Sequence, residues 1–294
     1  MFDKVLVPLD FSEYSQKILD HISEIPGIKE VVLLHVVDAT RPLKLEWKND
    51  QPHVKNTQLL MAEKKQFLEN LGLKVLVNID VIVNAITQGT ISHAILEIAE
   101  TQDVSLIVMG ARGINPIQEL LLGSVSSFVL RHAKTNVLVM HIPPASAEGA
   151  ALQDSSPQKL FSKVLVPTDF SRPSSSALAF IKTITGINEV VLLHVVNRAE
   201  SLSEIGVSTK GAQQKLGELK REFEKTGMQV EIRVRVGDPT EMILSVAQED
   251  AISLIAMSAF GTDWLREMIL GSTTFTVVRR TKKPVLILRT GQET

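Results

Sequence analysis

The feature that most constrains the fold of this chain is an internal repeat. Residues 4–12 read KVLVPLDFS, and residues 163–171 read KVLVPTDFS. Residues 27–37 read GIKEVVLLHVV, and residues 186–196 read GINEVVLLHVV. Both pairs share an offset of 159 residues, which is too regular to be coincidence. The chain therefore contains two copies of one structural unit in tandem.

The offset between the copies changes along the chain. Residues 91–113 align with residues 239–261 at an offset of 148. The eleven-residue difference predicts a deletion in the second copy, in the variable stretch after residue 197. Loops between elements tolerate such length changes.

A short segment between the copies has the composition of a linker. Residues 145–159 are rich in Ala, Ser and polar residues and show no strand or helix periodicity, which is typical of a flexible connection. The expected domains are residues 1–144, called repeat 1, and residues 160–294, called repeat 2. A length of 294 residues suits two domains of this size.

Within repeat 1, apolar runs alternate with amphipathic segments. The runs are rich in β-branched residues and nearly continuous, as in parallel strands buried on both faces. The expected strands are residues 4–8, 30–37, 74–83, 104–110 and 136–142. The expected helices begin after Ser12, cover residues 57–71, begin after Thr90, and cover residues 124–132; the third helix of repeat 2 begins at Asp238 and Pro239. The alternation predicts an α/β protein of two tandem doubly wound, Rossmann-like domains, each a five-stranded parallel sheet with helices on both faces.

Composition excludes several classes of function. The chain has no cysteine, which rules out disulfides, thiolate metal sites and cysteine nucleophiles. A net charge of −2 and 4% aromatic residues argue against nucleic acid or an anionic membrane as partner. The first residues lack the apolar run of a signal peptide, and no apolar stretch is long enough to span a membrane. A cytoplasmic location is expected.

The strongest chemical signal is a glycine pattern after the fourth expected strand. Gly110, Gly113 and Gly123 are followed by Ser124, with spacings of two and nine residues between the glycines. Glycines let the backbone turn tightly and approach a ligand, and the helix that starts at Ser124 would point free amides at the same place. Ser124 and Ser126 would add hydroxyl donors. A plainer interpretation is that the glycines only close a loop between strand and helix.

The position of this pattern favours a ligand site. In doubly wound sheets, ligands bind at the carboxyl ends of the strands, near the switch in strand order. That rule points to the ends of the first and fourth strands, where Asp10 and Gly110 lie. The pattern therefore indicates a polyphosphate cradle, and a nucleotide is the expected ligand.

These motifs together resemble the universal stress protein family. The resemblance rests on G-x2-G-x9-G-[ST], the amino-terminal VLVPxDFS and the LLHVV strand, and it is weakest over residues 38–73 and 197–226. It implies an adenine nucleotide alpha hydrolase-like fold and ATP, or another adenine nucleotide, with Mg²⁺ or Mn²⁺. By position, it implies adenosine contacts at Pro8, Leu9, Asp10 and Val36, with Asp10 on ribose or on a nucleotide-bound divalent cation. The implied phosphate contacts are Met109, Gly110, Arg112, Gly113, Gly123, Ser124, Val125 and Ser126.

Repeat 2 departs from this pattern. Ser258 replaces the first glycine and Phe260 replaces the equivalent of Arg112. A Cβ at position 258 would obstruct close approach and would restrict φ if a positive value were needed there. We therefore expect a weakened or empty second site, formed by Pro167, Thr168, Asp169, Val195, Ser258, Gly261, Gly271, Ser272 and Thr274.

Three functions remain open at this point: an ATP-binding regulatory module in a stress response, a slow ATPase or self-phosphorylating enzyme, and a dimeric scaffold with vestigial sites. No catalytic residue is assigned. His35 and His194, in repeated apolar runs, are expected to be satisfied core histidines. The apolar fifth strands, residues 136–142 and 284–290, predict an intramolecular pseudo-dimer, with further homodimer formation left open. The loop of residues 114–122, with its leucines 120–122, is expected to become ordered when nucleotide binds.

Overall fold

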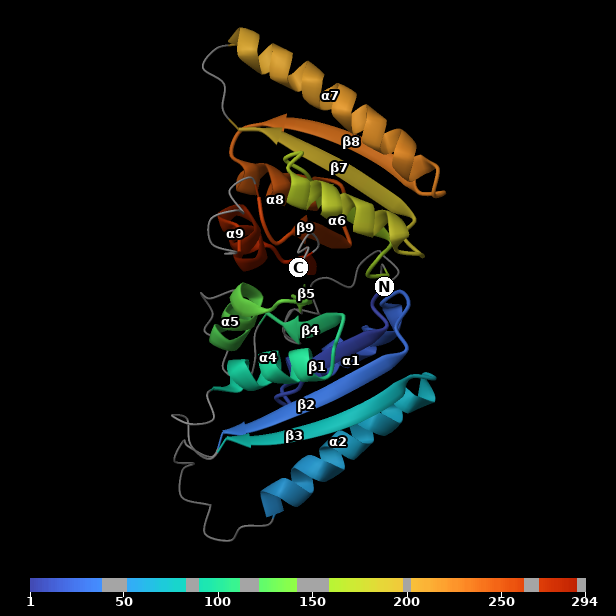
Figure 1. Cartoon of the computed structure of the whole chain (residues 1–294), viewed down its shortest axis with the longest axis vertical. Coiled ribbons are helices and arrows are strands. Elements are labelled where there is room, and N and C mark those ends of the chain that lie inside the picture. The colour runs from blue at the N-terminus through green and yellow to red at the C-terminus, as the bar shows by residue number, and fades with distance from the viewer. Residues whose placement is uncertain are drawn as a thin grey trace.

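The computed structural model describes residues 1–38, 52–82, 90–111, 122–141, 159–197, 202–261 and 270–289. Repeats 1 and 2 lie end to end along the long axis and have the same architecture (Figure 1). The elements of repeat 1 are β1 (Lys4–Pro8), α1 (Glu13–Asp20), the 3₁₀ helix η1 (Ile22–Glu24), β2 (Glu30–Asp38), α2 (Pro52–Asn70), β3 (Lys74–Ile82), α4 (Ile91–Thr101), β4 (Leu106–Gly110), α5 (Ser124–His132) and β5 (Asn136–Met140).

Repeat 2 reproduces this order without a counterpart of η1 among its described residues. Its elements are β6 (Lys163–Pro167), α6 (Arg172–Thr183), β7 (Glu189–Val196), α7 (Leu202–Glu224), β8 (Gln229–Val236), α8 (Pro239–Glu249), β9 (Leu254–Ser258), α9 (Ser272–Arg280) and β10 (Val285–Leu288). The alternation of strand and helix confirms the predicted α/β fold. The expected fourth strand was two residues too long at its start, because β4 begins at Leu106.

The ten strands form one continuous sheet in the order β3-β2-β1-β4-β5-β10-β9-β6-β7-β8. Within each repeat the neighbouring strands are parallel. The strand order reverses between β1 and β4, and between β6 and β9 in repeat 2. These are the switch points at which doubly wound folds hold ligands.

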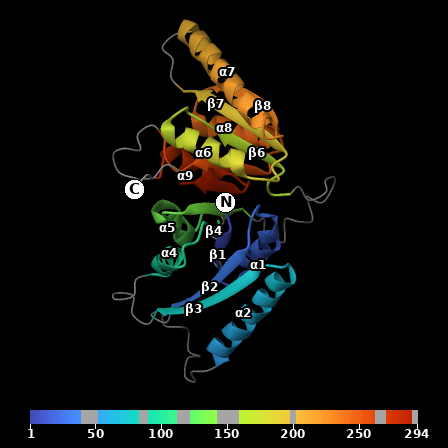
Figure 2. The same cartoon turned by 45° about the vertical axis from the view of Figure 1, so that its right-hand side comes forward.

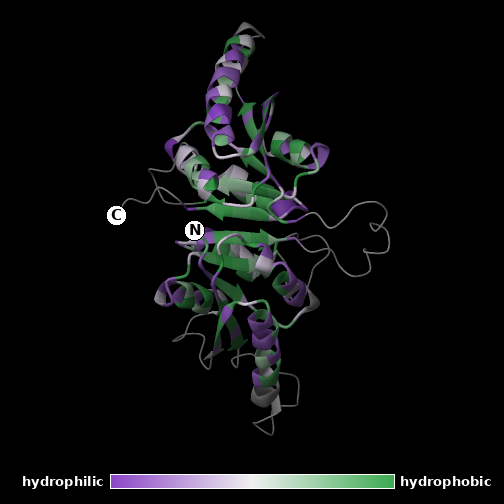
Figure 3. Cartoon of the chain, turned by 90° about the vertical axis from the view of Figure 1, so that its right-hand side faces the viewer, coloured by the Kyte–Doolittle hydropathy of each residue, from purple (hydrophilic) through white to green (hydrophobic). Residues whose placement is uncertain are grey.

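The two halves of the sheet meet through β5 and β10. These strands pair antiparallel, with Leu138 opposite Leu286 at the centre of the register. Both are coloured hydrophobic where they face each other across the middle of the molecule in Figure 3. The predicted pseudo-dimer is confirmed, because each apolar edge strand has the other as its partner.

The helices cover both faces of the sheet, and each covering layer runs through both repeats. One apolar core lies beneath α1, α2, α6 and α7, and the other lies beneath α4, α5, α8 and α9. The N-terminus lies at the junction of the repeats (Figure 1), where the Phe2 ring is 5.3 Å from the ring of Phe180 in repeat 2. The junction is therefore built as part of the protein core.

Polar contacts across the junction follow the internal symmetry. Arg289, just after β10, donates from Nη2 to Leu130 O on α5 at 2.6 Å. His141, just after β5, places Nε2 3.0 Å from Val278 O on α9. These contacts are equivalent under the offset of 148, so each repeat reaches the helix of the other from the end of its last strand.

The length difference between the repeats is divided between two loops. The offset is 159 between β2 and β7, falls to 155 between β3 and β8, and falls to 148 at α4 and α8. Four residues are therefore missing before β8 and seven after it. We predicted a single deletion in the variable stretch after residue 197. This prediction was wrong for the larger group of missing residues, which are absent after β8.

Two of the expected helix starts are capped as the sequence indicates. Ser12 and Asp238 each accept a backbone amide three residues on, and Ser171 does the same at the start of α6. Thr90 occupies the N-cap position of α4 but caps no amide. Its Oγ1 instead lies 2.8 Å from both Ser92 Oγ and His93 Nδ1. The proposed linker lies outside the described residues, except for Lys159.

Candidate functional site

The candidate site of repeat 1 begins where β1 ends. Pro8 has no amide hydrogen, so the chain can leave the sheet there. The Leu9 amide still donates to Leu34 O at 2.7 Å, which holds the departing chain against β2. His35 Nδ1 lies 2.7 Å from Leu9 O and must carry the proton, since a carbonyl only accepts. His35 is therefore a satisfied structural histidine, as predicted.

The turn after Leu9 contains a strained residue, Phe11, that the sequence analysis did not predict. Phe11 has a φ of 56°, in the left-handed region that non-glycine residues rarely occupy. Its ring packs on the His35 ring with centroids 4.5 Å apart. Phe170 repeats the conformation in repeat 2 at 61°, against His194 at 4.5 Å. Such strain persists only where packing enforces it, which is common at ligand sites.

The strained turn presents Asp10 at the carboxyl end of β1. Asp10 Oδ1 accepts from the Ser12 amide at 3.0 Å and from Ser12 Oγ at 2.6 Å. Ser12 Oγ in turn accepts from the Ser15 amide at 3.1 Å at the start of α1. Asp10 is therefore held in one orientation by the cap of the following helix.

The second half of the site is the junction of β4 and α5. The Ala111 amide donates to Met140 O at 2.8 Å, and the Gly123 amide donates to Ala111 O at 2.7 Å. These bonds close the base of the glycine loop, because they fix its two ends against each other. Since β1 and β4 are neighbouring strands, the loop base lies beside the turn that carries Asp10.

Ser126 has a different role from the one expected. Its side chain is buried, and Oγ donates to Gly110 O at 2.7 Å. Thr274 makes the equivalent bond to Ser258 O at 3.0 Å in repeat 2. The prediction of a hydroxyl donor to phosphate at Ser126 was wrong, because that proton fastens the first turn of α5 to β4. Only its backbone amide remains a predicted phosphate contact.

The first turn of α5 is a suitable place for an anion. Gly123 is the N-cap and supplies no side-chain hydrogen bond, so the first amides of α5 lack the usual intrahelical and capping acceptors. Ser124 is exposed, and Val125 packs partly against the core beneath. Free amides and the positive end of the helix dipole together attract phosphate.

The remaining predicted contacts divide between described and undescribed residues. Met109 is buried at the end of β4, and Val36 is half-buried on β2. Arg112, Gly113 and residues 114–121 lie outside the described residues. Of the leucines at 120–122, Leu122 is described, and its side chain is buried.

Repeat 2 keeps the same arrangement of turns. Gly261 and Asp169 belong to different loops, yet a Cβ on Gly261 would lie 3.5 Å from Asp169 Oδ2. Asp169 is exposed, and its Oδ1 accepts from the Ser171 amide. Gly271 caps α9 without a side chain, and its amide donates to Ala259 O at 2.8 Å. Ser272, exposed, begins α9.

Two buried side chains of repeat 2 differ from their counterparts in repeat 1. Phe260 is buried in the core beneath α8 and α9, and the Arg289 guanidinium lies 5.6 Å from its ring centre. Thr168 replaces Leu9 and is buried, with Oγ1 accepting from the Phe170 amide at 3.0 Å. Pro167 ends β6, and Val195 lies half-buried on β7.

The condition attached to the backbone part of the argument about position 258, a positive φ, is not met. Gly110 and Ser258 are the last residues of β4 and β9, and neither has a positive φ. A serine is therefore conformationally tolerated there. The remaining difference is steric, since Ser258 brings a buried side chain whose Oγ accepts from the Phe260 amide at 3.3 Å.

Among the described residues, no group of three or more His, Asp or Glu side chains could hold a metal ion. In the part of the chain that the structure describes, no helix is long and apolar enough to cross a membrane.

Comparison with known proteins matches both repeats to one family. A family model described as the universal stress protein family matches residues 1–141 and 160–289. A universal stress protein of Methanocaldococcus jannaschii is 30% identical over 155 residues, covering 44% of this chain and 96% of that protein. One of Bacillus subtilis is 33% identical over 151 residues, covering 48% of this chain and 99% of that protein.

A solved structure extends the match to the whole chain. The universal stress protein from Archaeoglobus fulgidus has 25% sequence identity and a TM-score of 0.66, covering 99% of this chain and 100% of that one. The tandem arrangement therefore occurs in a relative of the same length.

Proposed function

The chain belongs to the universal stress protein family, and we propose that repeat 1 binds an adenine nucleotide, with ATP as the preferred ligand, to regulate a stress response. One observation carries the proposal. The strained turn that presents Asp10 and the uncapped first turn of α5 lie on neighbouring strands at the switch in strand order. This is the place and the chemistry that a nucleotide requires.

The described residues suggest how the ligand would be divided between the two halves of the site. The adenosine would lie beside Pro8, Leu9 and Asp10, with Val36 on the neighbouring strand. The phosphates would accept from the first amides of α5 and from the glycine loop. Asp10 would hold ribose, or a Mg²⁺ or Mn²⁺ ion bound to the phosphates, because its orientation is already fixed by Ser12.

Binding is favoured over hydrolysis for a physical reason. Hydrolysis of ATP needs a group that orients the attacking water and groups that stabilise developing charge. Asp10 already accepts two hydrogen bonds from Ser12 through Oδ1, and the hydroxyl of Ser126 is committed to Gly110 O. We therefore propose a regulatory module that responds to occupancy.

Titration calorimetry of the full chain with Mg-ATP tests the proposal. We expect one nucleotide per chain, bound by repeat 1, because Ser258 and Phe260 obstruct the equivalent place in repeat 2. Two equal sites would contradict this interpretation of repeat 2, and no binding would favour the scaffold function.

Hydrogen exchange in the same samples would report the output of binding. Slower exchange within residues 110–126 on addition of ATP, with residues 258–274 unchanged as the internal control, would support a regulated loop. Unaltered exchange over residues 114–122 at saturation would leave a binding site without a visible response.

A further inference from the structure

Repeat 1 exposes apolar side chains at its outer end, on α2 and the strand that follows it. The exposed large hydrophobic residues there are Leu59 (70% exposed), Phe67 (40%), Leu71 (46%) and Val77 (37%). Leu60, Phe67 and Leu71 follow spacings of seven and four residues, so they lie along one stripe of the helix and its end. We call Leu59, Leu60, Phe67, Leu71 and Val77 the α2 surface.

Repeat 2 carries polar residues at the equivalent places of α7. Under the offset of 155, Glu222 and Thr226 stand at the positions of Phe67 and Leu71. Glu222 accepts from Lys182 Nζ at 2.6 Å, and this hydrogen bond lowers the pKa of its carboxyl group. Figure 2 shows α2 and α7 at opposite ends of the molecule. The apolar stripe is therefore not a requirement of the fold.

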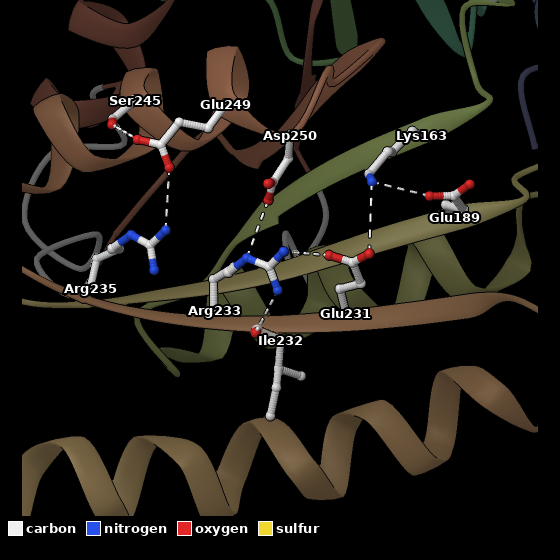
Figure 4. Close-up of polar contacts among 9 residues, drawn as sticks. All are labelled: Lys163, Glu189, Glu231, Ile232, Arg233, Arg235, Ser245, Glu249 and Asp250. Carbon is white, nitrogen blue, oxygen red and sulfur yellow. Dashed lines mark hydrogen bonds and ion pairs between the residues drawn. The ribbon is translucent and has the colours of Figure 1, made fainter.

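The two edge strands of the sheet also differ in the charge of equivalent residues. β3 and β8 are the outermost strands. On β8, Arg233 forms ion pairs with Glu231 at 2.6 Å and Asp250 at 3.3 Å, as Figure 4 shows. The positions equivalent to Glu231 and Arg233 on β3 are Leu76 and Asn78. Charges on an edge strand discourage pairing with another chain, so β8 is protected in a way that this part of β3 is not.

We propose that the α2 surface and the edge of β3 are the interface through which two copies of this chain form a homodimer. A two-fold axis at this edge would bring β3 beside its own copy in antiparallel pairing and would bring the two α2 stripes together. Such an interface uses one patch twice and closes at two chains. The internal junction at β5 and β10 already shows that this sheet extends by pairing apolar edges.

Charge around the α2 surface suits a second copy in particular. Lys65 lies 3.6 Å from Glu69, and Lys64 lies 3.0 Å from Glu63. These two pairs on α2 balance in charge, so these parts of two identical surfaces meet without a like-charge excess. A strongly acidic or basic partner would find no complementary field here. The charged β8 edge at the other end keeps association from continuing into a filament.

Sedimentation of the full chain over a wide range of concentration tests the proposal. We expect the mass to rise from 32.4 kDa toward twice that value. The variant Phe67→Glu/Leu71→Thr places the residues of repeat 2 on repeat 1. It should weaken self-association by roughly tenfold or more, because a carboxylate would have to be buried in an apolar interface. Both positions are exposed, so folding should be unaffected.

Val207→Gln is the matched control. Val207 is an exposed apolar residue on α7, more exposed than Phe67 or Leu71, and its replacement should leave the dimer intact. A wild-type chain that stays monomeric throughout would overturn the proposal, as would a dimer that the double variant retains.

Discussion

The two repeats share the backbone devices of the candidate site and differ in the side chains that surround it. Both place a phenylalanine in the left-handed region, Phe11 and Phe170, and both hold it against a histidine, His35 and His194. Features present in both copies therefore build the backbone frame of the site and do not by themselves distinguish the two sites. Features present in only one copy mark where the functions of the two copies have diverged.

The differences gather at two places, the glycine loop and the outer end of each repeat. At the loop, repeat 2 has a buried Ser258 and a buried Phe260 where repeat 1 has Gly110 and Arg112. At the outer end, repeat 1 has Phe67 and Leu71 where repeat 2 has Glu222 and Thr226. We infer that repeat 1 carries both the ligand site and the surface for association, while repeat 2 acts mainly as its permanent partner.

The sharpest test of this division is a pair of matched glycine substitutions. Gly113→Val should weaken ATP binding by roughly a hundredfold or more, equivalent to ~2.7 kcal/mol, because its side chain would occupy the space of a phosphate. Gly261→Val is the equivalent change in repeat 2. Its Cβ would meet Asp169 Oδ2 at an ordinary contact distance of 3.5 Å, so we expect no change in binding. Calorimetry with Mg-ATP measures both.

The opposite result would break the comparison. If Gly261→Val lowered the stoichiometry or the affinity as much as Gly113→Val, repeat 2 would be the functional site, or an equal one. Thermal unfolding of both variants without nucleotide would separate loss of binding from loss of structure.

The second test concerns Arg289, whose guanidinium is buried at the junction of the two repeats. Burial lowers the pKa of Arg289 to about 10, which corresponds to ~3 kcal/mol of cost for the charged form. Arg289→Met removes this cost and leaves Leu130 O without its donor, a loss of about 1 kcal/mol. We expect unchanged stability or a gain of up to ~2 kcal/mol at pH 7, measured by urea unfolding.

The pH dependence of this effect has a defined sign. The cost of burying charged Arg289 is fully present below pH 10 and declines as the pH rises above the lowered pKa of about 10, since the folded chain then binds fewer protons than the unfolded one. The gain from Arg289→Met should therefore shrink above pH 10. A loss of more than ~2 kcal/mol at pH 7 would instead indicate that an acidic partner compensates the guanidinium.

The fold could be predicted because its signals are local and occur twice. Three local signals each predicted structure through a simple physical rule. They were the continuous β-branched runs, the capping residues Ser12 and Asp238, and the apolar edges at β5 and β10. The doubly wound class of fold then pointed to the ends of the first and fourth strands as the place of the switch. The position of the candidate site followed from the switch.

The roles of particular side chains could not be predicted in the same way. Nothing local distinguishes Ser126, which is bonded to Gly110 O, from Ser124, which is exposed. The left-handed turn at Phe11 depends on His35, which lies on another strand. The recurrence of Phe and His at the same places in both copies was the available signal. The contact of Arg289 with Leu130 O needed the relative placement of the two repeats.

The smallest effect that we predict concerns the amino-terminal ends of the strands, opposite to the candidate site. There the two repeats form similar charged clusters in which the signs of the charges are exchanged. In repeat 1, Glu30 accepts from two lysines, Lys4 at 3.1 Å and Lys74 at 2.5 Å. In repeat 2, Lys163 lies between two carboxylates, Glu189 at 3.2 Å and Glu231 at 3.9 Å. The Glu30 side chain is 17% exposed and that of Glu189 is 42% exposed, so the cluster of repeat 1 is screened less by water.

This difference should appear in the pH dependence of stability. The hydrogen bonds from Lys74 and Lys4 lower the pKa of Glu30 below 4.5, so its stabilisation is present above that pH and is lost as the pH falls through the lowered value. Glu30→Gln should cost roughly 0.5–1 kcal/mol at pH 7 and almost nothing once Glu30 is protonated in both states. Glu189→Gln should cost less at pH 7, because its lysine is shared and its carboxylate is more exposed. Urea unfolding of the two variants between pH 7 and the acid limit of folding measures both costs. Equal costs at pH 7 would mean that the reversed polarity has no energetic consequence, and that the two halves of the sheet differ in function only at the loop and the outer edge.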